Sequence, residues 1–182
     1  MKRKWIAYHE AGHAVVAAVL DLLRNDTVVS IVSDVRGEDG FVTVPKKAFD
    51  FKKRSPRYIR KMILSYYAGP AVSKKLWPQI NLFEEGGAFE SDMVFAEHLM
   101  RYCAPPSCEW IGDSVFQSFK ERMWKKAQSL VASRWTDIRS VANALLERKT
   151  LTGDEVHYII NRRESARRKP DNARLRSSPA QR

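Results

Sequence analysis

The distribution of apolar and polar residues over the first quarter of the chain predicts one helix and two strands. Apolar residues at helical spacing cover one face of residues 4–24, and the pattern ends at residues 25–26. Residues 27–33 are rich in β-branched side chains and predict a strand, and residues 36–40 predict a turn. Residues 41–44 predict a second strand, which can pair with the first as a hairpin.

The sequence after Pro56 is helical in pattern. Ser55 and Pro56 are typical of a helix start, because proline is tolerated in the first turn. Gly69–Pro70 predicts a break or kink before the helix continues to about Trp77. Residues 78–87 predict a loop.

The later helices are delimited by caps. Ser91 is the expected N-cap of a helix over residues 92–102, and residues 113–149 predict one kinked helix or two in sequence. Thr152 is expected to cap a last helix, with Glu155 at the capping-box position. We therefore expect a mostly α fold of the α+β class, in which a small β-hairpin or sheet lies beside the first helix.

The length and composition are those of one folded domain. The chain has 182 residues, 44% of them hydrophobic, which suffices for one core but not for a second domain of ordinary size. Its longest apolar run, Ala14–Leu20, is far shorter than the roughly 20 residues of a membrane span. The sequence has no phosphate-binding loop motif, so we expect no ATPase module. The expected organisation is one domain over residues 1–165 and a basic tail over residues 166–182.

Basic residues are concentrated in two segments of this chain, whose net charge is +11. Residues 162–182 hold eight basic and two acidic residues with almost no apolar side chains, which predicts disorder beyond about residue 166. Residues 46–61 hold eight Lys and Arg against Asp50 alone. This second segment is typical of a solvated surface, and the alternative is a site for an anionic partner, such as nucleic acid, or for an acidic substrate.

The start of the chain and its cysteines favour a cytoplasmic protein. Residues 1–4 with the apolar segment after them resemble a signal peptide, but three polar residues interrupt that segment and no cleavage pattern follows. Cys103 and Cys108 have the spacing of neither a redox pair nor a zinc knuckle, and we expect reduced thiols. A local disulfide in an exported protein is the alternative.

Residues 9–13, His-Glu-Ala-Gly-His, carry the candidate chemistry. On a helix, His9 and His13 share a face and can both reach one zinc ion, while Glu10 points at its open position. Zinc lowers the pKa of a bound water, and a nearby carboxylate can take the proton as the water attacks a carbonyl. The usual use of this arrangement is peptide-bond hydrolysis, and the alternative is two histidines with no metal. Tyr8 and Gly12 are assigned to the scaffold.

The residues alone leave the third zinc ligand open. A carboxylate or a third imidazole would complete the set, and the candidates are Asp92, Glu84, Glu85, Glu97, His98 and His157. The alternative role of Asp92 is a charge at a helix N-terminus.

Several segments, in the same order, resemble the FtsH family of ATP-dependent zinc metallopeptidases. Residues 7–14 match the zinc signature of that family, and residues 145–156 resemble its C-terminal helical motif. Three weaker likenesses are to its substrate-binding edge strand, its small-residue helical turn and the segment with its third ligand, at residues 41–45, 67–71 and 91–96. Taken together, the likeness covers about residues 4–160.

The resemblance implies a Zn²⁺ site of His9, His13 and Asp92, with Glu10 as the general base. It also implies a metalloendopeptidase whose polypeptide substrate is flexible or unfolded. The ATPase module and membrane anchors of the family have no counterpart ahead of His9, so we expect a stand-alone domain that does not unfold substrates itself. A separate ATPase chain or a homo-oligomer stays open as a partner.

Two rival functions are retained. A catalytically silent domain of the same fold would use its basic surface and tail to bind an anionic partner such as nucleic acid, with zinc structural or absent. A latent peptidase would assemble its site only in an oligomer or after removal of the tail. Metal content, and cleavage by the wild type compared with Glu10→Gln, distinguish these functions.

Overall fold

The structure is a computed structural model, and it describes residues 2–32, 40–43, 50–80, 88–104 and 114–174. The helices are α1 (Lys2–Val19), η2, a 3₁₀ turn (Phe51–Lys53), α2 (Pro56–Leu76), α3 (Ala88–Met100), α4 (Ser114–Ser133), α5 (Trp135–Arg148) and α6 (Gly153–Arg174). The strands are β1 (Val28–Ser30), β2 (Phe41–Val42) and β3 (Thr150–Thr152). The prediction of a mostly helical α+β fold is confirmed.

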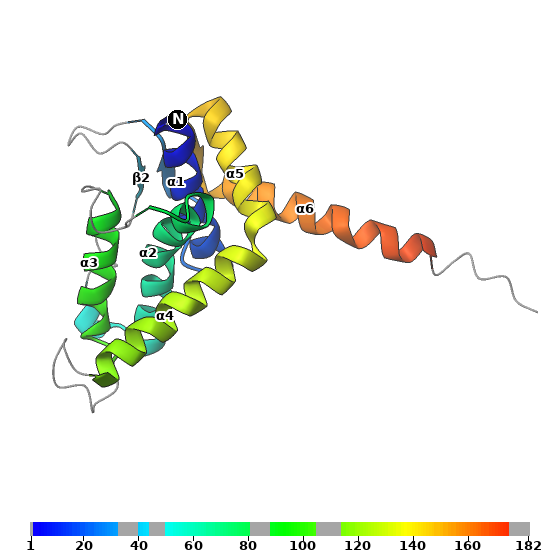
Figure 1. The fold of residues 1–182 in the computed structure, drawn as a ribbon. Helices are drawn as coiled ribbons and strands as arrows, with labels where there is room; N and C mark the ends of the chain where they lie inside the picture. The colour runs from blue at the N-terminus through cyan, green and yellow to red at the C-terminus, as the bar shows by residue number, and fades with distance from the viewer. Residues whose placement is uncertain (1, 33–39, 44–49, 81–87, 105–113, 175–182) are drawn as a thin grey trace, which may run out of the picture.

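Helix α1 is the buried centre of the fold. It lies between α2 and α5 (Figure 1), and its residues from Ile6 to Ala17 are buried without interruption. Gly12 faces α2 so closely that a Cβ there would come within 2.8 Å of Val72 and 3.0 Å of the Ala68 carbonyl oxygen. A glycine at this position therefore permits the close helix contact that brings the two candidate histidines against α2.

The sheet contains the predicted hairpin and one strand that was not predicted. Its order is β2-β1-β3, with β1 antiparallel to both neighbours, so β2 is an edge strand. The reading of every residue after Pro56 as helical is wrong at β3. This strand has three residues between two helices, a length at which periodicity carries no signal, and it is defined by its pairing with β1.

Helix α2 runs without interruption through Gly69–Pro70 and ends at Leu76, so the break is wrong and the kink, the other predicted outcome, stays a prediction. Proline removes one backbone donor, and here tertiary packing outweighs that loss because Pro70 and its neighbours are buried against the rest of the fold. The predicted start is confirmed, since the Ser55 side chain accepts a hydrogen bond of 3.2 Å from the Tyr58 backbone N–H.

The other predicted helix limits had mixed outcomes. Helix α3 begins at Ala88, so Ser91 lies inside the helix and is not its N-cap. For residues 113–149, the described part has the second of the two predicted arrangements, two successive helices over residues 114–133 and 135–148. The capping box is confirmed: the Glu155 N–H donates to Thr152 Oγ1 (3.3 Å) and the Thr152 N–H donates to Glu155 Oε2 (2.7 Å).

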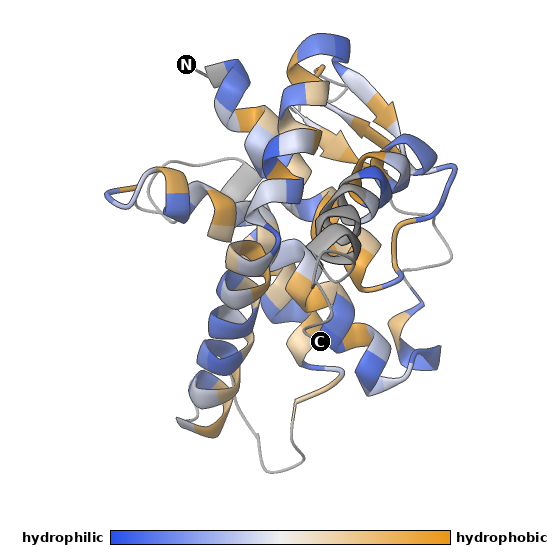
Figure 2. Ribbon diagram, turned by 90° about the vertical axis from the view of Figure 1, so that its right-hand side faces the viewer, coloured by the Kyte–Doolittle hydropathy of each residue, from blue (hydrophilic) through white to orange (hydrophobic). Residues whose placement is uncertain are grey.

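Apolar residues gather on the inward sides of the helices and polar ones on their outward sides (Figure 2). One buried cluster joins α1 to the sheet and α5, and a second joins α2, α3 and α4. Cys103 is buried with a free thiol in the second cluster, and Cys108 lies outside the described residues. Within the described part of the chain, no helix combines the length and apolar content needed to cross a membrane.

Helix α6 overlaps the segment predicted to be disordered. The helix extends to Arg174, past the start of that segment at residue 166, and residues 175–182 lie outside the described part. Disorder of the tail and the domain limit at residue 165 stay predictions.

Candidate metal site

Helix α1 brings the two histidines of the motif together. His9 and His13 are one turn apart, both are buried, and their Nε2 atoms are 3.0 Å apart. The rings meet edge to face with centroids 4.7 Å apart. The two imidazoles therefore lie on one face of α1, as their spacing predicts.

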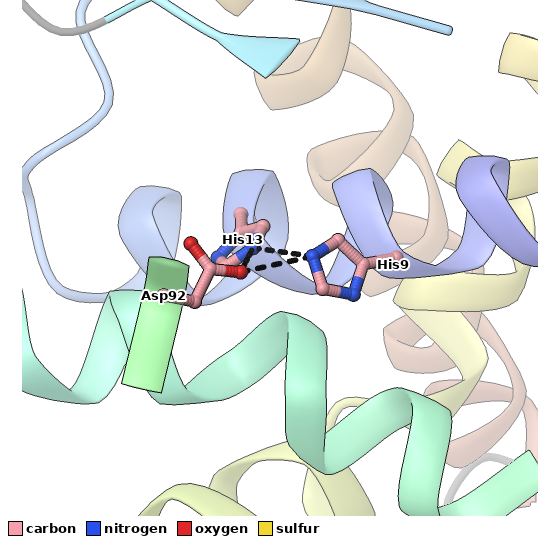
Figure 3. A group of neighbouring side chains, drawn as sticks. All are labelled: His9, His13 and Asp92. Atoms are coloured by element: carbon pink, nitrogen blue, oxygen red, sulfur yellow. Dashed lines mark hydrogen bonds and ion pairs between the residues drawn. The ribbon is translucent and has the colours of Figure 1, made fainter. Parts of the chain in front are cut away.

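Asp92, from the second turn of α3, faces both imidazoles. Its Oδ2 atom lies 3.0 Å from His9 Nε2 and 2.9 Å from His13 Nε2 (Figure 3). Among the described residues, these three side chains form the group that could hold a metal ion. Two segments 79 residues apart in the sequence therefore bring three candidate ligand atoms to one point.

Two hydrogen bonds on the far sides of the rings orient them. His13 Nδ1 lies 2.7 Å from the Ser65 carbonyl oxygen, which only accepts, so Nδ1 carries a proton. His9 Nδ1 lies 3.3 Å from Ser73 Oγ, whose own proton goes to the Gly69 carbonyl oxygen, so this Nδ1 also donates. When both rings are neutral, each directs its Nε2 lone pair at the other two candidate ligand atoms, as a metal requires.

The charges at this point favour a bound cation. Burial lowers the pKa of His9, so this ring is neutral. Burial also opposes charge on His13, but Asp92 and Glu10 outweigh it and raise the pKa of His13 to about 9. Burial opposes the charged form of Asp92 too, yet its contacts with the two histidines lower its pKa to about 2. The charged Asp92 carboxylate is therefore balanced by one cation. In the metal-free protein this cation is the protonated His13 ring.

We expect zinc binding at pH 7 to release about one proton per site, because zinc replaces the proton on His13. Apparent affinity should rise about tenfold per pH unit from pH 7 and level off above the His13 pKa of about 9. Calorimetry in buffers with different ionisation enthalpies measures the released protons. A value near zero would contradict this protonation state.

Gly69 is a site residue that the sequence analysis did not single out. A Cβ there would lie 2.7 Å from His9 Nε2 and would also overlap His13 Nε2. The middle of α2 thus forms a floor directly beneath the candidate ligand atoms. Only glycine at position 69 leaves room for the two imidazoles. Ser65 and Ser73, one turn to either side, supply the hydrogen bonds that orient the rings.

Glu10 is buried but lies outside the group of three ligand atoms. A Cβ on Gly40 would lie 2.8 Å from Glu10 Oε1, so the carboxylate contacts the residue immediately before β2. The structure therefore places a carboxylate between the candidate metal ligands on α1 and the edge strand of the sheet.

The other candidate ligands are elsewhere. Glu97 forms an ion pair with Lys120, and His157 Nε2 donates to the Leu23 carbonyl oxygen at 3.2 Å. His98 is exposed and its ring packs beside those of Phe95 and Tyr102. Glu84 and Glu85 lie outside the described residues.

The donor set fits zinc. Tetrahedral zinc with bonds of about 2.0–2.2 Å separates its ligand atoms by roughly 3.3 Å. The three separations here are 2.9–3.0 Å, a few tenths shorter. Two imidazoles and one carboxylate are a known set for catalytic zinc, which leaves a fourth position open.

The chain is similar over most of its length to part of several zinc metalloproteases. The chain is 26% identical to the ATP-dependent zinc metalloprotease FtsH of Caldicellulosiruptor bescii, over 87% of this chain and 30% of the relative. It is 24% identical to FtsH of Mycoplasma pneumoniae, over 86% of this chain and 25% of the relative. It is also 24% identical to FtsH 2 of Symbiobacterium thermophilum, over 88% and 30%. No family model matches the chain.

These similarities are distant and partial. The chain spans at most about a third of the length of the relatives it matches. They support a peptidase-family function and relate this chain to zinc-dependent proteins, and they leave the substrate and the partners of the chain to be proposed.

Proposed function

We propose that this domain is a zinc-dependent endopeptidase, with zinc held by His9, His13 and Asp92. The observation that carries the proposal is the convergence of three ligand atoms within about 3 Å of one another, with both imidazoles oriented by hydrogen bonds on their far sides. Without a metal these side chains hydrogen-bond one another, and a bound metal ion would replace the His13 proton at the point they share.

Zinc at this point would act as a Lewis acid that polarises the scissile carbonyl and lowers the pKa of the attacking water. Glu10 would take the proton of that water and then pass it to the leaving amine nitrogen. Burial of Glu10 against Gly40 holds the carboxylate in place for both transfers. Asp92 would keep the two imidazoles aligned as well as bind the metal.

Strand β2 offers a surface for an extended substrate. One side of β2 pairs with β1, and as the edge strand it leaves its other side without a strand partner in the described sheet. An extended polypeptide can add to such an edge through main-chain hydrogen bonds. Because Gly40 contacts Glu10, a peptide along β2 would lie beside the proton-transfer group.

Flexible or unfolded polypeptides are the proposed substrates, since a strand-like conformation is required. A separate ATPase chain or further copies of this chain are proposed partners, and a cytoplasmic location stays a prediction.

Nucleic-acid binding has no specific structural support: in the basic segment, Lys53 pairs with Asp50, Lys61 pairs with Asp21, and residues 44–49 lie outside the described part.

We expect the purified domain to bind about one zinc per chain and to cleave unfolded casein. Incubation with a chelator should remove the zinc and lower cleavage at least ~100-fold, because the carbonyl then loses its Lewis acid. Readdition of one equivalent of zinc should restore the rate, and magnesium should not. Zinc-loaded protein without any cleavage, together with salt-sensitive binding of nucleic acid, would instead support the silent binding protein.

A further inference from the structure

A groove between α5 and α6 lies outside the candidate metal site. It has a volume of about 500 Å³ and is lined by Ala144, Glu147, Arg148, Asp154, Glu155, Tyr158 and Ile159. Tyr158 is 64% exposed, more than the other exposed large hydrophobic residues of the described chain, Val32, Val94 and Tyr102. Ala144, Tyr158 and Ile159 supply the apolar part of the lining.

The groove is acidic in a strongly basic protein. Its lining has three carboxylates and one arginine, and Arg148 is already paired with Glu155 at 2.7 Å. Within the described residues, no ion pair engages Glu147 or Asp154. The groove thus combines an apolar floor with two carboxylates that can receive a basic segment.

The chain itself carries such a segment. Residues 162–182, here called the basic arm, have eight basic and two acidic residues. The arm begins on α6, which leaves the body of the protein and points away from it (Figure 1). Each helical residue after Ile159 lies about 1.5 Å farther along α6 from the groove. The backbone of residues 167–174 therefore lies at least ~12 Å beyond Ile159 while α6 is helical, whereas residues 162 and 163 are within about one turn of the groove.

We propose that the acidic groove binds the basic arm of a second copy of this chain. Each copy has one groove and one arm, so two copies can exchange arms and form a closed dimer with two identical contacts. The attraction between the arm and the groove is electrostatic and is screened by salt. The apolar floor around Tyr158 adds a contact that salt does not weaken. This inference does not depend on zinc binding or on catalysis.

Sedimentation equilibrium of the full chain at low salt tests the proposal. We expect a dimer in 50 mM salt, and association at least ~10-fold weaker in 500 mM salt. A chain truncated after Asn161 should be monomeric under both conditions. A labelled peptide of residues 162–182 should bind this truncated chain, as measured by fluorescence anisotropy.

Charge reversal identifies the groove as the acceptor. Glu147→Lys should weaken the dimer at least ~10-fold, whereas Glu121→Lys, an equal charge change on the exposed surface of α4, should not. Reversal of Arg167, Arg168 and Lys169 to glutamate should also weaken it, and the combination with Glu147→Lys should restore it. Circular dichroism checks that each variant is folded.

Three outcomes would overturn the proposal. The full chain could be monomeric at low salt, the truncated chain could remain dimeric, or Glu121→Lys could weaken the dimer as much as Glu147→Lys. An arm that binds nucleic acid while the full chain stays monomeric would assign the arm to a different partner.

Discussion

Glu10→Gln is expected to lower the rate of casein cleavage by about 10²–10⁴-fold while zinc stays bound at one ion per chain. Glutamine keeps the shape of the side chain beside Gly40 but cannot accept a proton from water. Glu10 is not among the three converging ligand atoms, so its replacement should leave the metal in place. Initial rates with metal analysis of the same sample measure both quantities.

A matched control separates this effect from a general effect of charge loss. Glu121→Gln removes the same charge from an exposed position on α4 and should leave the rate within about twofold of the wild type. The role proposed for Glu10 would be refuted by a variant that retains zinc and cleaves at the rate of the control. Loss of zinc in Glu10→Gln would point to a role in holding the site.

Gly69→Ala should weaken zinc binding by about 10–100-fold or more, because the added methyl group overlaps the Nε2 atoms of both histidines. An alanine inside a helix normally stabilises it by about 1 kcal/mol relative to glycine. The expected result is nevertheless a large loss of metal affinity together with a lower free energy of unfolding, because the buried imidazoles must move in the metal-free protein as well. Competition with a fluorescent chelator measures the affinity, and urea denaturation measures the free energy of unfolding.

Gly153→Ala is the matched control for this prediction. A Cβ at Gly153 would overlap the Arg24 carbonyl oxygen, where α6 starts against the turn after α1. This variant should lower the free energy of unfolding and keep its zinc affinity. If Gly69→Ala binds zinc as tightly as the wild type, α2 does not form the floor of the site.

The sequence predicted those parts of the fold that local chemistry determines. Ser55 caps α2 and Thr152 pairs with Glu155 at α6 because side chain and backbone are within three residues of each other. Strand β3 and the first turn of α3 depend on tertiary packing. Such features have no local signal and were missed.

The same distinction applies to the candidate site. His9, Glu10 and His13 follow from a spacing within one helix. The choice of Asp92 among six candidate third ligands came only from the family resemblance, because it lies on another helix. Gly69 had no signal as a site residue. Its role becomes visible only when α2 is packed against α1, where a side chain would displace the imidazoles.

Anomalous diffraction at the zinc absorption edge, from crystals of the zinc-loaded protein, tests the central claim most directly. We expect a single peak within about 2.0–2.2 Å of His9 Nε2, His13 Nε2 and a carboxylate oxygen of Asp92, with one further position open to solvent. A peak bound by other residues, or zinc whose four positions are all filled by protein atoms, would contradict the proposal of a catalytic zinc site.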